Sequence, residues 1–598
     1  MMSSLWRRSW ICLVVMACSA SAWIIPNVPL MAPPKSQGHR ACQSSDKGHH
    51  HVHSSRVIMG ASDTSSDHAK TDDATATAAT ARLEETARAL NAALEVCVAE
   101  KFINICAVRV APSSSVGADN ASMRLGLVTA KAVAKSDATV LAIPHDDSWI
   151  LTASTVQKVI FEGLLPDDYD GWTGPAGWLA LGLLNEMAKL AGKGIPNKPP
   201  RKAPLQTLME AWIEALPTPQ ELQQTHPYLW PNEDDQELLQ SSSTKKLYLQ
   251  LDDLEEDANW LQDRLWSKDR STFPESITTN GGTTIPCFSV DGFRYAMALV
   301  QSRAVFVDGQ LRLIPIMDMA NHKSSANEVV GGYMGTFGTL AGTVFKSSSK
   351  LAAGQEVFAS YGPKSAAEYL LEHGFVPDDV VNGNMRATAE LKAELDADAT
   401  FRDDKLDILE FETGSELGSM EPTQTFDVDD SGEPDFALLQ FMRLVKLSGK
   451  DAFLLESIFR QEVWGFMELP VSVSNERAAL TSLRSLCEGH IQDMDAVEVT
   501  KQQPQEDSST TTTRTTLTKQ QAQCKRVRDL ERLALQRTMD YLQRDVEALD
   551  LKEYYQERRL KDLGLDSEWS DDDDSEEDGL GDFPVPTKRV PGGADYDF

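Results

Sequence analysis

Two strand-like apolar runs, each of which stops abruptly on polar residues, constrain this chain more than any other feature. The first run starts at residue 313 and ends on Asn321 and His322, and the second lies within residues 354–362 and leads to Tyr361. Polar residues that follow such strands commonly carry the chemistry of α/β and β-rich enzymes. The pattern therefore predicts one site to which both runs contribute.

Length and charge limit the class of protein. The chain has 598 residues, of which 41% are hydrophobic, so we expect two or more domains with real cores. Its formal net charge of −33 argues against direct binding to a nucleic-acid backbone, which needs clustered Lys and Arg. Part of that charge lies in an acidic block at residues 571–578, and we expect residues 566–598 to be a disordered, solvated tail.

The N-terminus has the features of a targeting sequence. Arg7 and Arg8 precede an apolar segment at residues 10–17, which is too short to span a bilayer, and small residues come next. This order predicts a signal peptide over residues 1–22 and no membrane association of the mature chain. Residues 23–60 are basic, Ser-rich and almost free of acidic residues, and they resemble the leaders of algae with secondary plastids. We therefore expect the plastid stroma, with secretion as the alternative.

Cysteine usage favours a reducing compartment. The cysteines outside this leader are scattered, odd in number and without a CxxC pair, so they do not form a disulfide framework. They are Cys97, Cys106, Cys287, Cys487 and Cys524. No set of metal ligands stands out, and no metal is expected.

The apolar pattern changes several times along the chain. Residues 61–80 have no apolar period and predict a linker. Short β-prone runs within residues 85–384 are interrupted at about 156–287 by helical periods. Within residues 390–565, the part at 391–435 is acidic and weakly patterned, whereas helical periods follow from residue 438 onward. They are interrupted by a low-complexity tract at 501–520, which we expect to be a disordered loop. These patterns predict an α+β domain with a helical insertion, followed by an all-α domain.

The candidate polar groups each have an ordinary structural explanation. Arg303 and Asp318 would form a structural ion pair, and His322 would satisfy backbone groups at a strand end. Tyr361 would be a turn residue with a hydrogen-bonded hydroxyl. The motifs GxGxxG, GxxxxGK[ST] and GxSxG do not occur, so dinucleotide, P-loop and hydrolase sites have no support.

Five motifs, taken together and in order, resemble the SET domain of the Rubisco large-subunit lysine methyltransferase group. They are Leu125-Gly126-Leu127-Val128, Ser302-Arg303, Asp318-Met319-Ala320-Asn321-His322, Gly354 to Gly362, and Gly374-Phe375. The resemblance covers residues 85–565. It implies a SET domain with small β-sheets, split by a helical insertion and followed by a helical substrate-binding domain. It also implies methyl transfer from S-adenosylmethionine to a protein lysine in a plastid.

The resemblance assigns a role to each candidate. Tyr361 would be the catalytic tyrosine, with its hydroxyl beside the sulfonium and the reacting amine. The positions implied to hold the cofactor are Met123, Arg124, Leu125, Asn321, His322 and Phe375. The positions implied to line the substrate side are Arg303, Asp318, Tyr333 and His373.

Three features differ from the Rubisco enzyme. Met123-Arg124 stand where that enzyme has Glu-Gly, so a bulky side chain occupies a place of close approach. The loop that contains Tyr333 is shorter and Gly-rich. His373 stands where the enzyme has Tyr, and we expect an imidazole there to alter the acceptor, the number of methyl groups added or the activity itself.

The C-terminal part has a narrower resemblance. Residues 451–460, 468–472 and 553–565 are similar to the SET proteins of the plastid transcriptionally active chromosome. That group is associated with the plastid-encoded RNA polymerase, so its subunits are implied as partners. The alternative to a working enzyme is therefore an assembly subunit with weak or lost catalysis.

Overall fold

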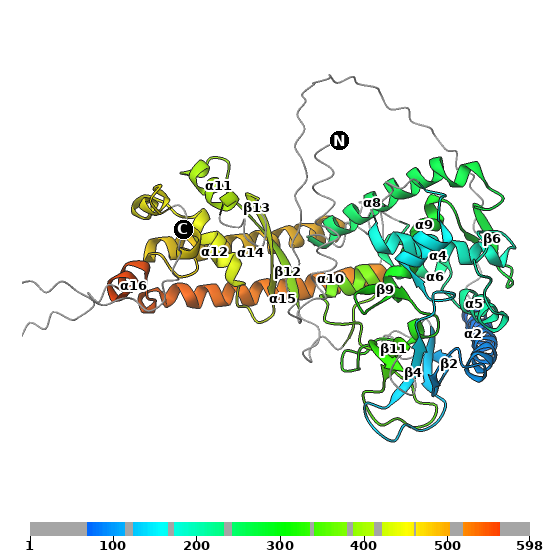
Figure 1. Ribbon diagram of the computed structural model, residues 1–598. Helices are drawn as coiled ribbons and strands as arrows, with labels where there is room; N and C mark the ends of the chain where they lie inside the picture. Colours follow the sequence, from blue (N-terminus) through cyan, green and yellow to red (C-terminus); the bar gives the residue numbers. More distant parts are fainter. Residues whose placement is uncertain are drawn as a thin grey trace, which may run out of the picture.

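The computed structural model describes residues 68–562 apart from nine short segments. Those segments are 114–123, 166–170, 172, 232–241, 335–339, 379–386, 412–420, 460–461 and 503–517. Three predicted segments lie outside the described residues: the targeting sequence at 1–60, most of the loop at 501–520 and the acidic tail at 566–598. The described chain forms an N-terminal body of small sheets and helices and a C-terminal body dominated by two long helices (Figure 1).

The N-terminal body contains four small antiparallel sheets. The largest has the strand order β1-β4-β11-β10, and the second pairs β2 with β3 along six residues. These strands are β1 (Ile105–Cys106), β2 (Val108–Ser113), β3 (Arg124–Thr129), β4 (Thr139–Pro144), β10 (Val330–Met334) and β11 (Leu340–Lys346). The other two sheets have the orders β5-β9-β8 and β6-β7. Their strands are β5 (Leu151–Thr152), β6 (Ser276–Thr278), β7 (Thr284–Pro286), β8 (Val305–Val307) and β9 (Gln310–Leu313).

Helices dominate the described sequence between β5 and β8, which also contains the β6-β7 pair. They are α3 (Ala153–Thr155), α4 (Gly174–Leu190), α5 (Ala203–Glu214), α6 (Pro219–Gln223), α8 (Ser242–Arg264) and α9 (Val290–Arg303). An unbroken run from Gly177 to Ala188 is buried in α4, because this helix is apolar on nearly all sides. Aromatic side chains pack around it, with Trp266 tilted against both Phe288 and Phe293. The helical insertion and the sheets therefore share one core.

The first helix differs from the linker that we predicted at residues 61–80. Helix α2 runs from His68 to Ala99, so it begins inside that segment. Ala is the strongest helix former, and residues 74–82 are mainly Ala and Thr without Gly or Pro. The absence of an apolar period was therefore a misleading sign, since a helix of this composition needs no buried stripe along its whole length.

The C-terminal body is mainly helical, with one small sheet. Its helices are α11 (Arg402–Phe411), α12 (Phe436–Val445), α13 (Val463–Phe466), α14 (Val473–Gln502), α15 (Lys519–Glu547) and α16 (Tyr555–Asp562). We did not predict the antiparallel pair of β12 (Thr388–Glu394) and β13 (Thr423–Asp429). In β12 the buried Ala389, Leu391 and Ala393 alternate with exposed or partly exposed charged residues, a period of two that the acidic composition obscured. None of the described helices is long and apolar enough to cross a membrane.

Helix α15 connects the two bodies because it contributes to both cores. Near its start, Cys524 and Val527 belong to the N-terminal core. Further along, Ala534, Leu535 and Leu542 belong to the C-terminal core. The long helices α14 and α15 run side by side away from the N-terminal body (Figure 1).

Polar contacts fix this helix to the segment around residue 376. The Val376 backbone N–H donates to Gln523 Oε1 at 2.9 Å, and Arg526 donates to the Pro377 carbonyl at 2.6 Å. Arg526 also pairs with Asp378. The position of Val376 is therefore tied to the C-terminal body.

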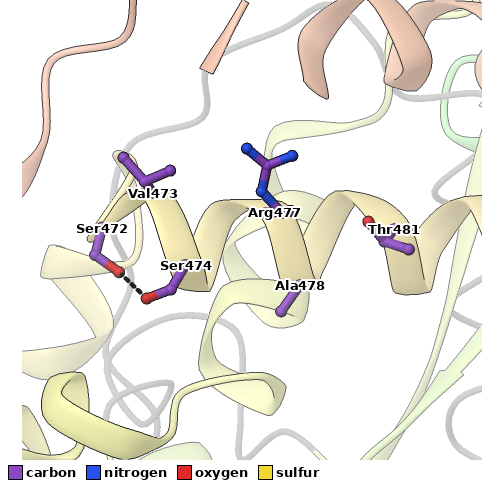
Figure 2. A pocket seen from close by; sticks show the side chains of 6 residues that line it. All are labelled: Ser472, Val473, Ser474, Arg477, Ala478 and Thr481. Atoms are coloured by element: carbon purple, nitrogen blue, oxygen red, sulfur yellow. Dashed lines mark hydrogen bonds between the residues drawn. The ribbon is translucent and has the colours of Figure 1, made fainter. Parts of the chain in front are cut away.

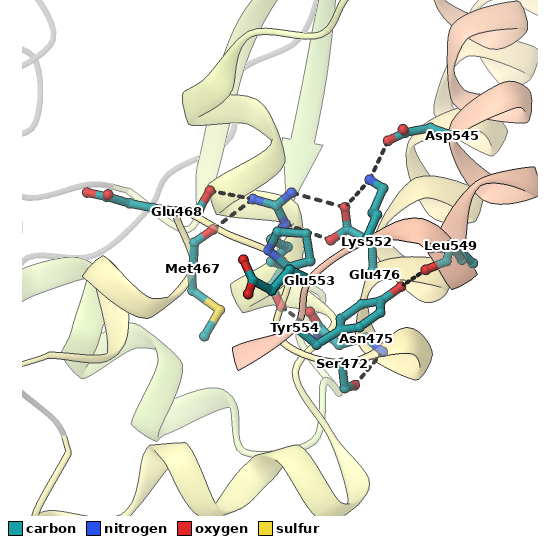
Figure 3. A network of polar contacts seen from close by, with 12 residues as sticks. Met467, Glu468, Ser472, Asn475, Glu476, Asp545, Leu549, Lys552, Glu553 and Tyr554 are labelled. Carbon is teal, nitrogen blue, oxygen red and sulfur yellow. Dashed lines mark hydrogen bonds and ion pairs between the residues drawn. The ribbon is translucent and has the colours of Figure 1, made fainter. Parts of the chain in front are cut away.

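A buried ionic network holds the far end of the C-terminal body together (Figure 3). Arg443 on α12 makes two bonds to the carboxylate of Glu476 on α14, at 2.7 and 3.0 Å. Lys552 donates to Glu476 at 2.9 Å and to Asp545 of α15 at 2.6 Å. The Glu476 side chain is fully buried, so three elements depend on one carboxylate.

Glu476→Gln should lower the free energy of unfolding by about 3–5 kcal/mol, because it leaves a buried guanidinium without its counter-charge. Burial raises the pKa of Glu476, but bonds to Arg443 and Lys552 more than offset this, so the net shift is downward. This stabilisation is therefore present above the unfolded pKa of about 4.3 and is lost as the pH falls through the lower folded value.

Denaturant titrations at several pH values check this. Glu488→Gln is the matched control on the same helix, because Glu488 pairs with Arg484 while its side chain is 42% exposed. The control should change stability by less than about 0.5 kcal/mol. Equal losses in the two variants would contradict the account.

Candidate active site

Residues 351–361 run between β3 and the segment at 321–323 and bond to both. The Val357 N–H donates to the Leu127 carbonyl at 2.8 Å, and the Thr129 N–H donates to the Gln355 carbonyl at 2.9 Å. On the other side, the Ala359 N–H donates to the Asn321 carbonyl at 2.9 Å. This two-sided pairing brings the ends of the two apolar runs together, as their pattern predicted.

Tyr361 is held at both of its ends. Its backbone N–H donates to His322 Nδ1 at 3.2 Å, and its hydroxyl donates to the Ala320 carbonyl at 2.8 Å. Because Nδ1 accepts, the proton of His322 lies on Nε2, which donates to Ser324 Oγ at 3.2 Å. Burial raises the pKa of Tyr361 to about 12, so the phenol stays protonated and acts as a hydrogen-bond donor. The strand-end role that we gave to His322 agrees with these contacts.

Asn321 is part of a second chain of hydrogen bonds. Its amide donates to Glu356 Oε1 at 2.7 Å, and Ser113 donates to Glu356 Oε2 at 2.6 Å. Gly126 lies directly against this pair, since a Cβ on it would be 2.7 Å from both Asn321 Nδ2 and Glu356 Oε1. The Asn321 side chain is therefore engaged within the protein, and β3 approaches it closely only because residue 126 is glycine.

Aromatic and imidazole rings surround Tyr361. The His373 ring lies 4.6 Å from its ring centroid, the His322 ring 5.0 Å and the Phe375 ring 6.4 Å. Gly374 makes this arrangement possible because it adopts φ +75°, and a Cβ there would be 3.1 Å from the Thr225 backbone. Four predicted site residues thus lie in one cluster.

Arg303 and Asp318 form an ion pair of 2.8 Å, as the structural explanation predicted. The Asp318 side chain is 1% exposed, and the Trp212 indole N–H of α5 is 3.1 Å from both of its carboxylate oxygens. Burial raises the pKa of Asp318 more than Arg303 and Trp212 lower it. The helical insertion therefore reaches the site through Trp212, which no sequence pattern marked.

Arg124 opens β3 beside this pair. Burial and the positive charge of Arg303 lower its pKa, whereas the nearby Tyr361 raises it. In the described part of the chain its guanidinium makes no ion pair with a carboxylate. Leu125 packs partly buried against the core. Met123 lies outside the described residues.

Tyr333 does not join the cluster. Its side chain, on the edge strand β10, is 77% exposed. Among the described residues it makes none of the ring contacts that connect Tyr361, His373 and Phe375. Sequence reasoning also missed Glu356 and Tyr369, although both lie within or beside the motifs that we used. Tyr369 contacts the His322 ring at 4.9 Å and donates its hydroxyl to the Gly362 carbonyl at 2.7 Å.

A metal site and a separate pocket are two other possibilities in the described chain. No group of three or more His, Cys, Asp or Glu residues there is arranged to hold a metal ion. A surface hollow of about 690 Å³ lies at the start of α14 (Figure 2) and is lined by Ser472, Val473, Ser474, Arg477, Ala478 and Thr481. The Ser472 hydroxyl there already donates to Asp451 at 2.5 Å.

Comparisons with known proteins agree with this architecture. The chain shares 81% of its length with a crystal structure of the SET domain of LSMT bound to methyllysine and AdoHcy, and covers 98% of that chain, with a TM-score of 0.58 and 24% identity. A structure of Rubisco LSMT bound to AdoMet gives a TM-score of 0.57 at the same identity and coverage. Residues 396–535 match the family model for Rubisco LSMT substrate-binding. The chain therefore has an α+β SET fold followed by a largely helical substrate-binding domain, which confirms the predicted fold class.

Two plant proteins of similar sequence identify the family to which the chain belongs. A chloroplastic fructose-bisphosphate aldolase lysine N-methyltransferase of Arabidopsis thaliana is 35% identical over 47% of this chain and 57% of its own length. A chloroplastic Rubisco large-subunit N-methyltransferase of Pisum sativum is 30% identical over 59% of this chain and 68% of its own length. The chain belongs to the Rubisco large-subunit methyltransferase family of SET-domain proteins.

Gly126→Ala should lower the free energy of unfolding by about 1–3 kcal/mol, because the new methyl group overpacks the hydrogen bond between Asn321 and Glu356. Denaturant titration measures this. Gly489→Ala on α14 is the control, since a Cβ at that position meets nothing within 4 Å. This substitution also replaces a glycine in the interior of a helix. The control should raise stability by about 0.5–1 kcal/mol. A Gly126→Ala protein as stable as the parent would show that this close approach is not required.

Proposed function

We propose that the protein is an S-adenosylmethionine-dependent protein-lysine N-methyltransferase that acts on a plastid protein. The proposal depends on the position of Tyr361. Two hydrogen bonds fix this residue inside a cluster of rings, at the place where two separate chain segments meet. Family membership supports the same activity, because both curated relatives are named as chloroplastic N-methyltransferases.

The residues present fit the proposed cofactor. Phe375 and His322 each offer a flat ring for contact with an adenine. Their ring centroids are 6.0 Å apart and their planes are tilted by 51°. Arg124 offers a guanidinium without a carboxylate partner in the described chain, which suits a carboxylate group. The side chains of Asn321 and His322 are engaged within the protein, so their contacts to a cofactor would use backbone groups or the ring face. When bound, S-adenosylmethionine supplies a methyl group on a sulfonium.

The site's task is to present a neutral amine to that methyl group. A free lysine has a pKa of about 10.4, so the amine must lose a proton before it attacks. Positioning and exclusion of water then supply most of the rate. The Tyr361 hydroxyl remains protonated, and its oxygen keeps acceptor capacity that can orient the amine. On this proposal Arg303 and Asp318 shape the substrate side as a fixed pair.

The relatives suggest the first acceptors to try. One is named for fructose-bisphosphate aldolase and the other for the Rubisco large subunit, so we propose plastid proteins of this kind as substrates. The reducing compartment inferred from cysteine usage fits this proposal, because all five described cysteines are free.

Tyr361→Phe should reduce methyl transfer by at least about 100-fold, because it removes a preorganised hydroxyl from the reacting centre. The measurement is transfer of label from S-adenosylmethionine to a plant stromal extract, and cofactor binding is followed separately by calorimetry. Tyr295→Phe is the matched control, because it also removes a tyrosine-to-carbonyl bond, from Tyr295 to Pro217 at 2.7 Å, outside the ring cluster. Equal activity in the two variants would refute the role of Tyr361.

We propose, as a second candidate, an assembly role beside the plastid RNA polymerase. Its support is a group of exposed apolar side chains at the far end of the C-terminal body: Ile458 is 75% exposed, Leu469 50% and Leu551 87%. The chain segments that bear them lie against one another, since Arg558 donates to the Pro470 carbonyl and Arg559 lies over the Phe459 ring.

Affinity purification from plastids tests this second candidate. Polymerase subunits should copurify with the parent protein. They should be lost from the double variant that carries both Leu469→Asp and Leu551→Asp, while its methyl transfer is unchanged. Recovery of the polymerase with the double variant, or its absence from the parent sample, would contradict an assembly role.

A further inference from the structure

Five exposed lysines lie on three segments of the N-terminal body that contact one another. The segments are residues 130–137, 321–327 and 346–351. The lysines are Lys131, Lys135, Lys323, Lys346 and Lys350, which together form the lysine surface. The first segment follows β3, and the third begins at the last residue of β11. The three segments are far apart in the sequence, so the fold brings them together.

Backbone and side-chain hydrogen bonds join the three segments. Val133 and Leu351 exchange two backbone bonds, of 2.8 and 3.1 Å, and the Asp137 N–H donates to the Ser347 carbonyl at 2.8 Å. The side-chain amide of Asn327 donates to the same Ser347 carbonyl at 3.2 Å. The segments that bear the five lysines are therefore adjacent in the folded chain.

The lysine surface adjoins the candidate active site. Lys323 directly follows His322, and its backbone N–H donates to the Ala359 carbonyl at 3.0 Å. Residues 351–361 lead from the segment of Lys350 directly to Tyr361. A protein that covers the lysine surface therefore also lies close to the site.

The charge of these segments is opposite in sign to that of the whole chain. The strands and loops around the site contain seven Lys or Arg and three Asp or Glu, over the described stretches 105–113, 124–137, 321–334 and 340–361. The chain as a whole has a formal charge of −33. In the described part of the chain, none of the five lysines makes an ion pair. Positive charge is therefore concentrated here without counter-charges from the described chain.

We propose that the lysine surface binds an acidic segment of a partner protein. The identity of the partner rests on the proposed function: it is the acceptor protein, and the acidic segment lies beside the acceptor lysine. The ammonium groups of Lys346 and Lys350 then pair with Asp and Glu carboxylates of that segment. Complementary charge speeds the encounter and favours the right partner more than it adds affinity, so this surface selects among acceptor proteins.

A nucleic acid fits this surface less well than an acidic protein segment does. Duplex DNA carries one negative charge per about 1.7 Å over its whole length, so a bound duplex extends well beyond five lysines. Outside the lysine surface it faces a chain with a net charge of −33, and like charges within a Debye length of about 8–10 Å repel each other. A short acidic segment keeps its charge within the surface and avoids this repulsion.

Fluorescence anisotropy of a short labelled peptide tests the lysine surface. The peptide has one central lysine with Asp and Glu on both sides, and it is titrated with the full-length parent and with a surface variant that carries both Lys346→Glu and Lys350→Glu. The surface variant should bind at least about tenfold more weakly at low ionic strength, because two attractive contacts become repulsive. A peptide with Asn and Gln in place of the acids should bind neither protein.

A control variant makes the same change in net charge at another place. It carries Lys158→Glu and Lys268→Glu in the helical insertion, where both lysines are exposed. It should bind the acidic peptide within about twofold of the parent, because only charges near the bound peptide act strongly on it. Thermal unfolding checks that both variants are folded.

Label transfer to the stromal extract is then compared among the three proteins by peptide mass mapping. The lysines that the parent labels should have Asp and Glu as sequence neighbours. Their labelling should fall by about tenfold in the surface variant and stay near the parent level in the control variant.

The outcomes separate this inference from the proposed function. Equal peptide affinity of the parent and the surface variant overturns the lysine surface as a binding site. A short DNA duplex that binds the parent more tightly than the peptide does, and that the surface variant fails to bind, overturns an acidic protein partner. Labelled lysines without acidic neighbours overturn the acceptor protein as the partner. A parent that binds the peptide through these lysines but labels no stromal protein overturns the proposed function and leaves the surface as a binding site for acidic protein segments.

Discussion

The two-sided pairing of residues 355–361 is the interaction on which the site depends. One side of this segment bonds to β3 and the other to Asn321, so neither partner can be moved without displacing Tyr361. The pairing also places Gly126 against the bond between Asn321 and Glu356, where a side chain would not fit. A polar ring cluster that is costly to assemble is thus held by backbone hydrogen bonds, which do not depend on which ligand is present.

Buried charge is arranged differently in the two bodies. In the C-terminal body, Glu476 is fully paired by Arg443 and Lys552, an arrangement suited to holding helices in place. Near the site, Arg124 makes no ion pair within the described chain and His373 retains a bare nitrogen, whereas Asp318 and Arg303 satisfy each other. Arg124 and His373 both lie near Tyr361, and on the proposed function a substrate or cofactor would supply their partners. Helix α15 joins the bodies, since it packs in both cores and holds Val376 one residue beyond Phe375.

Much of this arrangement could be predicted from the sequence. The parts without a local sequence pattern could not. The apolar runs and the five motifs were enough to predict the SET fold and to bring Asn321, His322, Tyr361, His373 and Phe375 together. Trp212 was out of reach, because it lies 106 residues from Asp318 and looks like an ordinary core residue of a helix. The strand β12 and the start of α2 were missed because their acidic or Ala-Thr composition hid a short period and a high helix propensity. The role of Tyr333 on the substrate side stays a proposal, as its exposed position on β10 neither joins it to the cluster nor removes it from a substrate's path.

Peptide mass mapping of a stromal extract, after incubation with the full-length protein and labelled S-adenosylmethionine, tests the central claim most directly. The account predicts that label appears on the side chain of a lysine in a plastid protein, and that the labelled peptide gains the mass of one or more methyl groups. A protein that binds S-adenosylmethionine yet adds no methyl group to any stromal lysine would contradict the account.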